Sequence, residues 1–258
     1  MLGLSPMFTH IDSPLVVFLL ALAAQILAVI AGDYIRKRRQ VFRQDERHDF
    51  ATVQAATLTL LALIIGFTFS MAVTRYDQRK SLEEAEANAI GTEYLRVELL
   101  PGDLSSPARD LLRKYLDLRI AFYEADDPAA ADEIGRRTSN LQSELWSSVL
   151  PAASSPTPIT ALVIAGMNDV INAQGYAQAA WWNRIPRGAW TMMFLMAISC
   201  SLLVGYGEQR KGSIIVFFLP VVVSIAFFLI SDLDNPRGGV IRVHPQNLQA
   251  VVQSMTPQ

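Results

Sequence analysis

Four long apolar runs, separated by polar stretches, dominate the pattern along the chain. They cover residues 14–32, 53–73, 189–206 and 213–231. Each run approaches the ~20 residues that an α-helix needs to cross a hydrocarbon core of roughly 30 Å. Basic residues follow the first run instead of preceding it, which is not the order found in a signal peptide. The pattern therefore predicts four transmembrane helices.

Two polar or helix-breaking residues interrupt these apolar runs. Gln25 lies within the first run and Pro220 within the fourth. Lipid cannot hydrogen-bond an amide, nor the carbonyl that a proline leaves free. Both residues are therefore predicted to face protein.

The polar middle of the chain has helical periodicity and no clear strand period. Ser81 and Glu84 form a capping-box pattern, and Ser106 before Pro107 is typical of a helix start. The predicted apolar face of the first middle helix comprises Leu82, Ala85, Ala89, Ile90 and Leu95. That of the second comprises Leu111, Leu112, Tyr115, Leu116, Ile120 and Tyr123, and that of the third Ile134, Leu141, Leu145 and Val149. A fourth helix is predicted to run from the Ser- and Pro-rich stretch before residue 160 toward Trp181.

These elements predict an all-α integral membrane protein with four transmembrane helices and a helical extramembrane domain between the second and third. The predicted parts are an N-terminal segment (1–13), two transmembrane helices with a basic connecting loop (14–74), the helical domain (75–188), two further transmembrane helices (189–231) and a C-terminal tail (232–258). Trp181, Trp182 and Trp190 flank basic residues just before the third run, where aromatic side chains usually anchor a helix at the membrane interface.

Composition excludes several classes of function. The net charge of −2 provides no basic field for nucleic acid, and the single cysteine, Cys200, excludes an intramolecular disulfide. No nucleotide-binding or hydrolase motif occurs, so no cofactor is expected. Glu84, Glu86 and Asp110 lie on arginine-rich helices, where we interpret them as solvated faces or ion pairs, not as catalytic pairs. The chain is not expected to be an enzyme.

Charge in the loops bears on orientation in the plasma (inner) membrane. The connection between the first two runs is crowded with basic residues, and Arg210 and Lys211 lie between the last two. The positive-inside rule places both short loops in the cytoplasm and the helical domain outside. Arg75, Arg79 and Lys80, near one membrane end of that domain, favour the reverse.

The second run carries a stripe of small and hydroxylic residues on one helical face. The stripe comprises Thr52, Ala56, Thr59, Leu63, Gly66, Phe67, Ser70 and Thr74, spaced three or four apart. Small residues let a neighbouring helix approach closely, which the periodicity alone favours. Alternatively, the stripe lines a pore formed by several copies, with Leu63 and Phe67 as a hydrophobic constriction.

The end of this run resembles the second transmembrane helix of the bestrophin anion channels. Gly66 and Phe67 are followed, after five residues, by Val73-Thr74-Arg75-Tyr76, and "DLDNPRGG" at residues 232–239 resembles the Asn-Pro-x-Gly segment after the last bestrophin span. A looser resemblance to uncharacterised bestrophin-like membrane proteins covers residues 50–245. Its carriers are "GFTFSMAVTRYDQRKSLEEAEANAIGTEYL", "RDLLRKYLDLR", "MNDVINAQGY", "NRIPRG" and "LDNPRGG".

The resemblance implies a homopentamer in the lipid bilayer that conducts small, chloride-type anions passively through a central pore. The bestrophin neck positions fall on Thr59, Leu63 and Phe67, and Gly66 and Ser70 complete the implied pore lining. Arg75 is a candidate charge at the pore mouth, or else a structural ion-pair partner of an acid such as Asp77 or Glu83. In bestrophins the large helical part lies in the cytoplasm, opposite to the orientation that the basic loops favour.

Three further predictions concern polar residues outside the stripe. Asp232 and Asp234 are weak metal candidates, because two carboxylates fall short of calcium's six to eight oxygens and capping explains them better. The triplet Asn168, Asp169 and Asn172 is expected to form interhelix hydrogen bonds or a second constriction. If the chain does not conduct, the alternative function is a membrane sensor or scaffold whose helical domain docks a partner.

Overall fold

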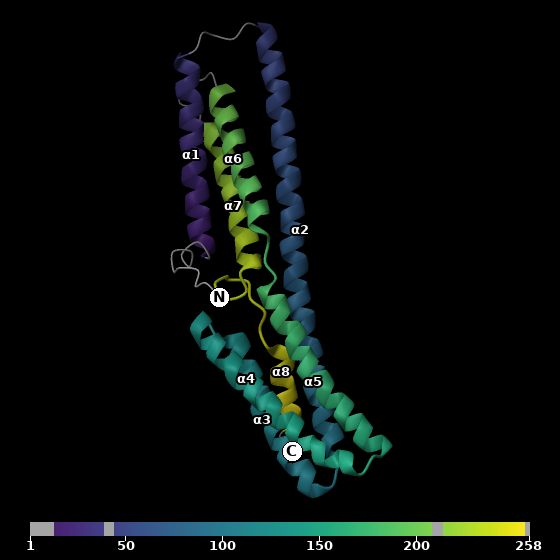
Figure 1. The fold of residues 1–258 in the computed structure, drawn as a ribbon. Coiled ribbons are helices and arrows are strands. Elements are labelled where there is room, and N and C mark those ends of the chain that lie inside the picture. The colour runs from purple at the N-terminus through teal and green to yellow at the C-terminus, as the bar shows by residue number, and fades with distance from the viewer. Residues whose placement is uncertain (1–12, 39–43, 208–213, 256–258) are drawn as a thin grey trace, which may run out of the picture. The chain divides into compact units, whose positions relative to one another are not determined.

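A computed structural model describes residues 13–38, 44–207 and 214–255, with side chains of residues 44–47 left out. Its helices are α1 (Pro14–Arg38), α2 (Gln44–Arg96), α3 (Gly102–Glu124), α4 (Pro128–Val149), α5 (Pro158–Trp182), α6 (Arg187–Gly207), α7 (Phe218–Asp234) and α8 (Gln246–Met255) (Figure 1). Short 3₁₀ turns lie at Val97–Leu99, Leu150–Ser154 and Ile214–Phe217. Within these residues there are helices and no strands, which confirms the all-α prediction. Residues 1–12 of the N-terminal segment, 39–43 of the first basic connection and 208–213 of the second, with Arg210 and Lys211, lie outside the described residues.

Four helical stretches are long and apolar enough to cross a membrane, and they contain the four predicted runs in α1, α2, α6 and α7. The chain divides into two compact units. The membrane unit comprises Met1–Arg75 and Arg184–Ile241, and the helical unit comprises Tyr76–Asn183 and Arg242–Gln258. Helix α8, which the sequence did not predict, belongs to the helical unit together with the end of the chain.

In the membrane unit, α1, α6 and α7 lie side by side (Figure 1). A Cβ on Gly205 of α6 would be 2.0 Å from the carbonyl oxygen of Val29 in α1, and a Cβ on Gly32 would be 2.2 Å from that of Leu202. Glycine at these two positions therefore lets the backbones of α1 and α6 touch.

A buried polar network joins the same three helices. Gln25 of α1 donates from Nε2 to Ser224 Oγ of α7 at 3.1 Å, and Ser201 Oγ of α6 lies 3.3 Å from Gln25 Oε1. Pro220 is also buried. Both interruptions of the apolar runs are buried against protein, as predicted, and the Gln25 amide finds hydrogen-bond partners on α6 and α7.

The core of the helical unit lies among α3, α4, α5 and the second half of α2. Leu112 and Tyr115 of α3, Leu145 of α4 and Met167 of α5 are fully buried there. Trp181 packs edge-on against the rings of Phe122 and Tyr123, with centroids 5.1 and 5.5 Å away. The prediction that Trp181 anchors the chain at the membrane interface is therefore wrong.

Helix boundaries in this unit differ from two predictions. Helix α2 continues through Ser81 to Arg96, so the capping-box pattern does not start a helix. Helix α3 begins at Gly102, and Pro107 lies inside it. By contrast, α5 starts as the sequence suggested, with Pro158 in the first turn and Thr157 Oγ1 accepting from the amide of Thr160 at 3.1 Å.

The predicted apolar face of α2 in the helical unit is only partly buried. Ala85 and Leu95 are exposed, and Leu95 shows 63% of its surface. Ile90 of the predicted face is fully buried, and Glu83, Glu86 and Glu93 are buried beside it at helical spacing. Glu83 and Glu86 have partners on other helices, which are described below.

Candidate functional site: the exposed stripe of α2 and its supports

The stripe of α2 that the sequence singled out is uncovered along its whole length within one chain. Its five predicted pore-lining residues, Thr59, Leu63, Gly66, Phe67 and Ser70, are all exposed. Phe67 shows 66% of its surface and Leu63 shows 53%. The stripe therefore makes none of the close intramolecular helix contacts that its small residues permit.

The opposite side of α2 is held against the rest of the membrane unit. Leu61, Thr68 and Ala72 are buried. Toward the start of the helix, Cys200 Sγ of α6 lies 3.5 Å from the carbonyl oxygen of Thr57. Helix α2 thus has one face fixed by its own chain and one face left for another molecule or for lipid.

The surroundings of Gly66 differ from those of a glycine at a packed helix contact. A Cβ built on Gly66 would meet no atom within 4 Å, whereas a Cβ on Gly205 would strike backbone at 2.0 Å. No contact among the described residues requires a glycine at position 66.

Hydroxyl groups on α2 are satisfied within the helix. Thr59 Oγ1 donates to the carbonyl oxygen of Ala55 at 2.9 Å, and Thr74 Oγ1 donates to that of Ser70 at 2.9 Å. Such bonds leave each side-chain oxygen with free lone pairs. The threonines of the stripe can therefore sit in an apolar environment without an unpaired donor.

Arg75 ends the stripe. It is partly buried, and its Nη2 lies 3.6 Å from Met71 Sδ, one turn earlier on the same helix. Glu83, one of the acids considered as its ion-pair partner, is engaged with α8. Its carboxylate accepts from the amides of Asn247 and Leu248, both at 3.0 Å, and from Asn247 Nδ2 at 2.6 Å.

The second polar group, Asn168, Asp169 and Asn172, lies on an exposed side of α5 in the helical unit. All three residues face away from the core formed by Val163, Met167 and Val170. Their role in a constriction or an interhelix network stays a prediction.

The segment after α7 is organised by the two aspartates considered as metal candidates. Asp232 accepts from the amides of Val240 and Ile241 at 2.6 and 2.8 Å, and Asp234 accepts from the amide of Ile185 at 2.9 Å. The two carboxylates therefore hold the segment that follows Pro236 and the connection between α5 and α6, and not the turn before Pro236 that the sequence favoured. Among the described residues, no group of three or more His, Cys, Asp or Glu side chains has a metal-binding arrangement.

A buried ion pair lies beneath the exposed surface of the helical unit. Glu86 of α2 binds Arg119 of α3, both side chains have no exposed surface, and Tyr123 OH donates to Glu86 Oε2 at 3.1 Å. Burial is the main cause that raises the pKa of the Tyr123 hydroxyl, with the Glu86 charge adding to it. The sequence left Glu86 as either a solvated residue or an ion-pair member, and the structure shows the ion pair; it did not identify Arg119 and Tyr123 as the partners.

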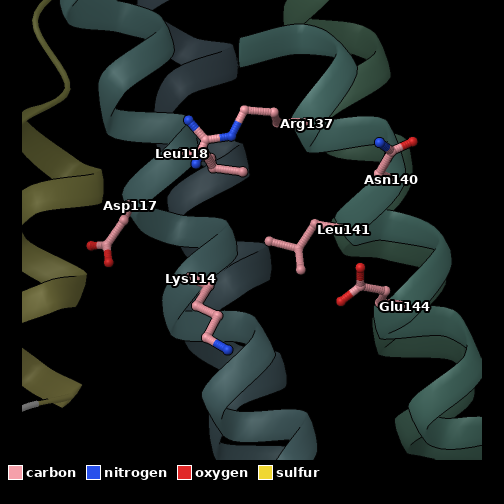
Figure 2. A pocket seen from close by; sticks show the side chains of 7 residues that line it. All are labelled: Lys114, Asp117, Leu118, Arg137, Asn140, Leu141 and Glu144. Carbon is pink, nitrogen blue, oxygen red and sulfur yellow. The ribbon is translucent and has the colours of Figure 1, made fainter. Parts of the chain in front are cut away.

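A shallow groove runs between α3 and α4 on the surface of the helical unit (Figure 2). Leu118 of α3 and Leu141 of α4 line it, and Arg137 extends from α4 toward α3. The remaining lining residues are Lys114, Asp117, Asn140 and Glu144. Charges of both signs alternate here, so the groove has no net field for an anion.

Comparison with known proteins identifies the family. A sequence model of the Bestrophin-like domain matches residues 17–248, which is most of the chain. The protein belongs to the Bestrophin-like family. With its four apolar helices, it is a multi-pass membrane protein. No curated protein matches the sequence.

Solved structures support the assignment of the fold. A crystal structure of a bacterial bestrophin homolog from Klebsiella pneumoniae with a point mutation is 15% identical, with a TM-score of 0.62, and the match covers 95% of this chain and 99% of that one. A structure of the Klebsiella pneumoniae homolog phased with zinc is 17% identical, with a TM-score of 0.59 and coverages of 93% and 95%. The bestrophin-like fold predicted from the sequence is thus confirmed.

Proposed function

We propose that this Bestrophin-like protein is a passive, chloride-type anion channel in which several copies gather the exposed stripes of α2 around one central pore. The observation that carries the proposal is the stripe itself. A transmembrane helix presents Gly66 with nothing within 4 Å among the described residues and Phe67 with 66% of its surface uncovered, while Leu61, Thr68 and Ala72 on the opposite side are buried. A homopentamer, as in bestrophins, is the proposed assembly.

Phe67 and Leu63 would form the narrow part of such a pore. Aromatic rings carry a partial positive charge at their edges, so a ring of Phe67 edges would stabilise a partly dehydrated anion weakly. Weak binding suits conduction, because an ion must leave as easily as it enters. Thr59 makes one end of this constriction more polar, and Arg75 would raise the local anion concentration at the other end of the stripe.

The proposal is tested by reconstituting the purified full chain into liposomes and measuring chloride efflux. We expect efflux from wild-type vesicles and a several-fold change in its rate for Phe67→Ala. Phe69→Ala is the matched control, because it removes the same ring from the same helix about 200° away around the axis. Phe69 is also exposed, at 41%.

Two results would overturn the channel proposal. Vesicles that hold chloride despite containing folded protein would favour the alternative of a non-conducting sensor or scaffold. Equal effects of Phe67→Ala and Phe69→Ala would remove the pore from the proposed face. Native mass spectrometry of the detergent-solubilised protein supplies the subunit count, and a monomer would exclude a shared pore.

A further inference from the structure

Glu93 is a buried acid without a hydrogen bond. Its side chain has no exposed surface, and neither carboxylate oxygen has a hydrogen-bond partner in the part of the chain that the structure describes. The nearest cation, Arg96 Nη1, is 3.9 Å from Oε2. Glu83 and Glu86, on the same face of α2, are by contrast both supplied with donors.

The carboxyl group of Glu93 lies directly against the backbone of α5. A Cβ built on Gly166 of α5 would be 1.8 Å from Glu93 Oε2 and 2.8 Å from its Cδ. Glycine at position 166 therefore creates the space that the carboxyl fills. The neighbouring α5 residues Val163, Met167 and Val170 are fully buried and apolar, so the site offers no solvation for a charge.

Two charged groups act on Glu93 from the two helices that meet here. Burial is the main cause that raises the pKa of Glu93 to about 8, Arg96 of α2 lowers it in part, and Asp169 of α5 raises it further. The carboxyl is therefore mostly protonated at neutral pH, although a solvated glutamate would be ionised.

We propose that the Glu93 carboxyl is a proton-binding site of the helical unit that holds its proton at neutral pH. Loss of this proton loosens the contact between α2 and α5 at Gly166. The site is sealed from solvent and filled by the carboxyl itself, so a proton is the ligand that fits. Once ionised, the group must gain water or move toward Arg96. Arg96 Nη1 lies against the same glycine, 2.6 Å from a Cβ built there, so either change rearranges the groups that pack on the α5 backbone at Gly166.

The sign of the pH dependence follows from linkage. The pKa of Glu93 in the folded protein lies above the unfolded value of 4.5, so the native state binds the extra proton between pH 4.5 and about 8. Stability is therefore lost as pH rises through this window and levels off above it. Between pH 6 and 7.5 the unfolding equilibrium constant should rise about tenfold per pH unit from this group alone.

The test compares unfolding of the detergent-solubilised full chain between pH 6 and 9 for the wild type and two variants. Glu93→Gln replaces the protonated acid by a neutral group of the same shape, and should remove the tenfold-per-unit dependence, so that it exceeds the wild type in stability at pH 8.5. Glu84→Gln changes an exposed acid of the same helix and should follow the wild type. Parallel profiles for the wild type and Glu93→Gln would overturn the proposal.

A second measurement needs no variant that might fail to fold. Infrared spectroscopy of the wild type should show the carbonyl band of a protonated carboxylic acid at pH 7, which disappears by pH 9.5. Absence of this band at pH 7 would also overturn the proposal.

Glu93 and the proposed pore residue Phe67 belong to the same helix α2. Any influence of the Glu93 proton on ion flux therefore rests on the proposed channel function, whereas the proton site itself does not. If vesicles do not conduct, the channel proposal fails, while the unfolding profiles still decide the proton site. If vesicles conduct and the profiles of the wild type and Glu93→Gln are parallel, the proton site fails alone.

Discussion

Replacing Gly205 by alanine should force α1 and α6 apart. The new Cβ would lie 2.0 Å from the carbonyl oxygen and 2.7 Å from the carbonyl carbon of Val29. Both are backbone atoms, so no side-chain rotation relieves the contact. Because protein interiors are close-packed, the two backbones must separate by about 1 Å or more to reach the shortest contacts that folded proteins tolerate.

The expected loss of stability combines two opposing effects. Overpacking a well-fitted contact costs about 1–3 kcal/mol. Alanine also stabilises a helix by roughly 0.5–1 kcal/mol relative to glycine. The separation additionally stretches the hydrogen bond between Ser201 and Gln25, one turn from the substitution. We therefore expect a net destabilisation of about 1–2 kcal/mol.

Unfolding of the detergent-solubilised protein measures this difference, and Gly66→Ala provides the control. Position 66 is a glycine in another transmembrane helix with nothing within 4 Å, so alanine there should leave the stability of the chain unchanged or slightly raised. Equal stability changes for Gly205→Ala and Gly66→Ala would refute the close approach of α1 and α6. A loss of assembly confined to Gly66→Ala would instead support close contact between copies along the stripe.

Two further predictions concern the buried acids of α2. Arg119→Met should destabilise the protein by about 3–5 kcal/mol in denaturant unfolding, because it leaves the buried Glu86 charge without a partner. Adding Glu86→Leu should recover most of this loss. A double variant no more stable than Arg119→Met would contradict the ion pair. Glu83→Ala should free α8 and speed proteolysis within residues 242–255, because three hydrogen bonds to that helix are lost, while Glu84→Ala should not.

The membrane part of the fold could be predicted from the sequence because its rule is simple. A helix in lipid must satisfy its own backbone, so each span needs a long apolar run, and the four runs correspond to α1, α2, α6 and α7. The same reasoning places Gln25 and Pro220 against protein. Predictions that rest on an obligatory physical cost were therefore confirmed at the level of single residues.

The helical unit was predicted less completely because its partners are far apart in sequence. The apolar positions Ala85 and Leu95 marked a face of α2 that is exposed. Periodicity assigns apolar residues to the core. It does not show that Arg119 pairs with one acid on another face of α2, or that the first amides of α8 donate hydrogen bonds to a second acid there. Trp181 was misassigned for a related reason, since its neighbours Phe122 and Tyr123 come from α3.

For the candidate site, the sequence identified the stripe on α2 but not the features that fix its opposite side. Spacing of three and four places Thr59, Gly66 and Phe67 on one face, and that face is uncovered. The cysteine contact that holds α2 at Thr57 comes from α6 and has no sequence signature. Residue spacing defines which side chains share the face, and the contacts of that face with other copies depend on the assembly.

The three buried glutamates of α2 show why spacing alone does not assign a role. All three lie on one helical face, and all three are buried. Glu83 receives amide donors from a helix end, and Glu86 receives a guanidinium and a phenol. Glu93 packs on the backbone of Gly166 without a hydrogen bond from the described residues, and Arg96 Nη1 is 3.9 Å away. The free energy of a buried charge depends on the donors that the surrounding helices supply. Glu93 alone lacks them, so it is the acid of this face whose protonation we expect to couple to the packing of α2 on α5.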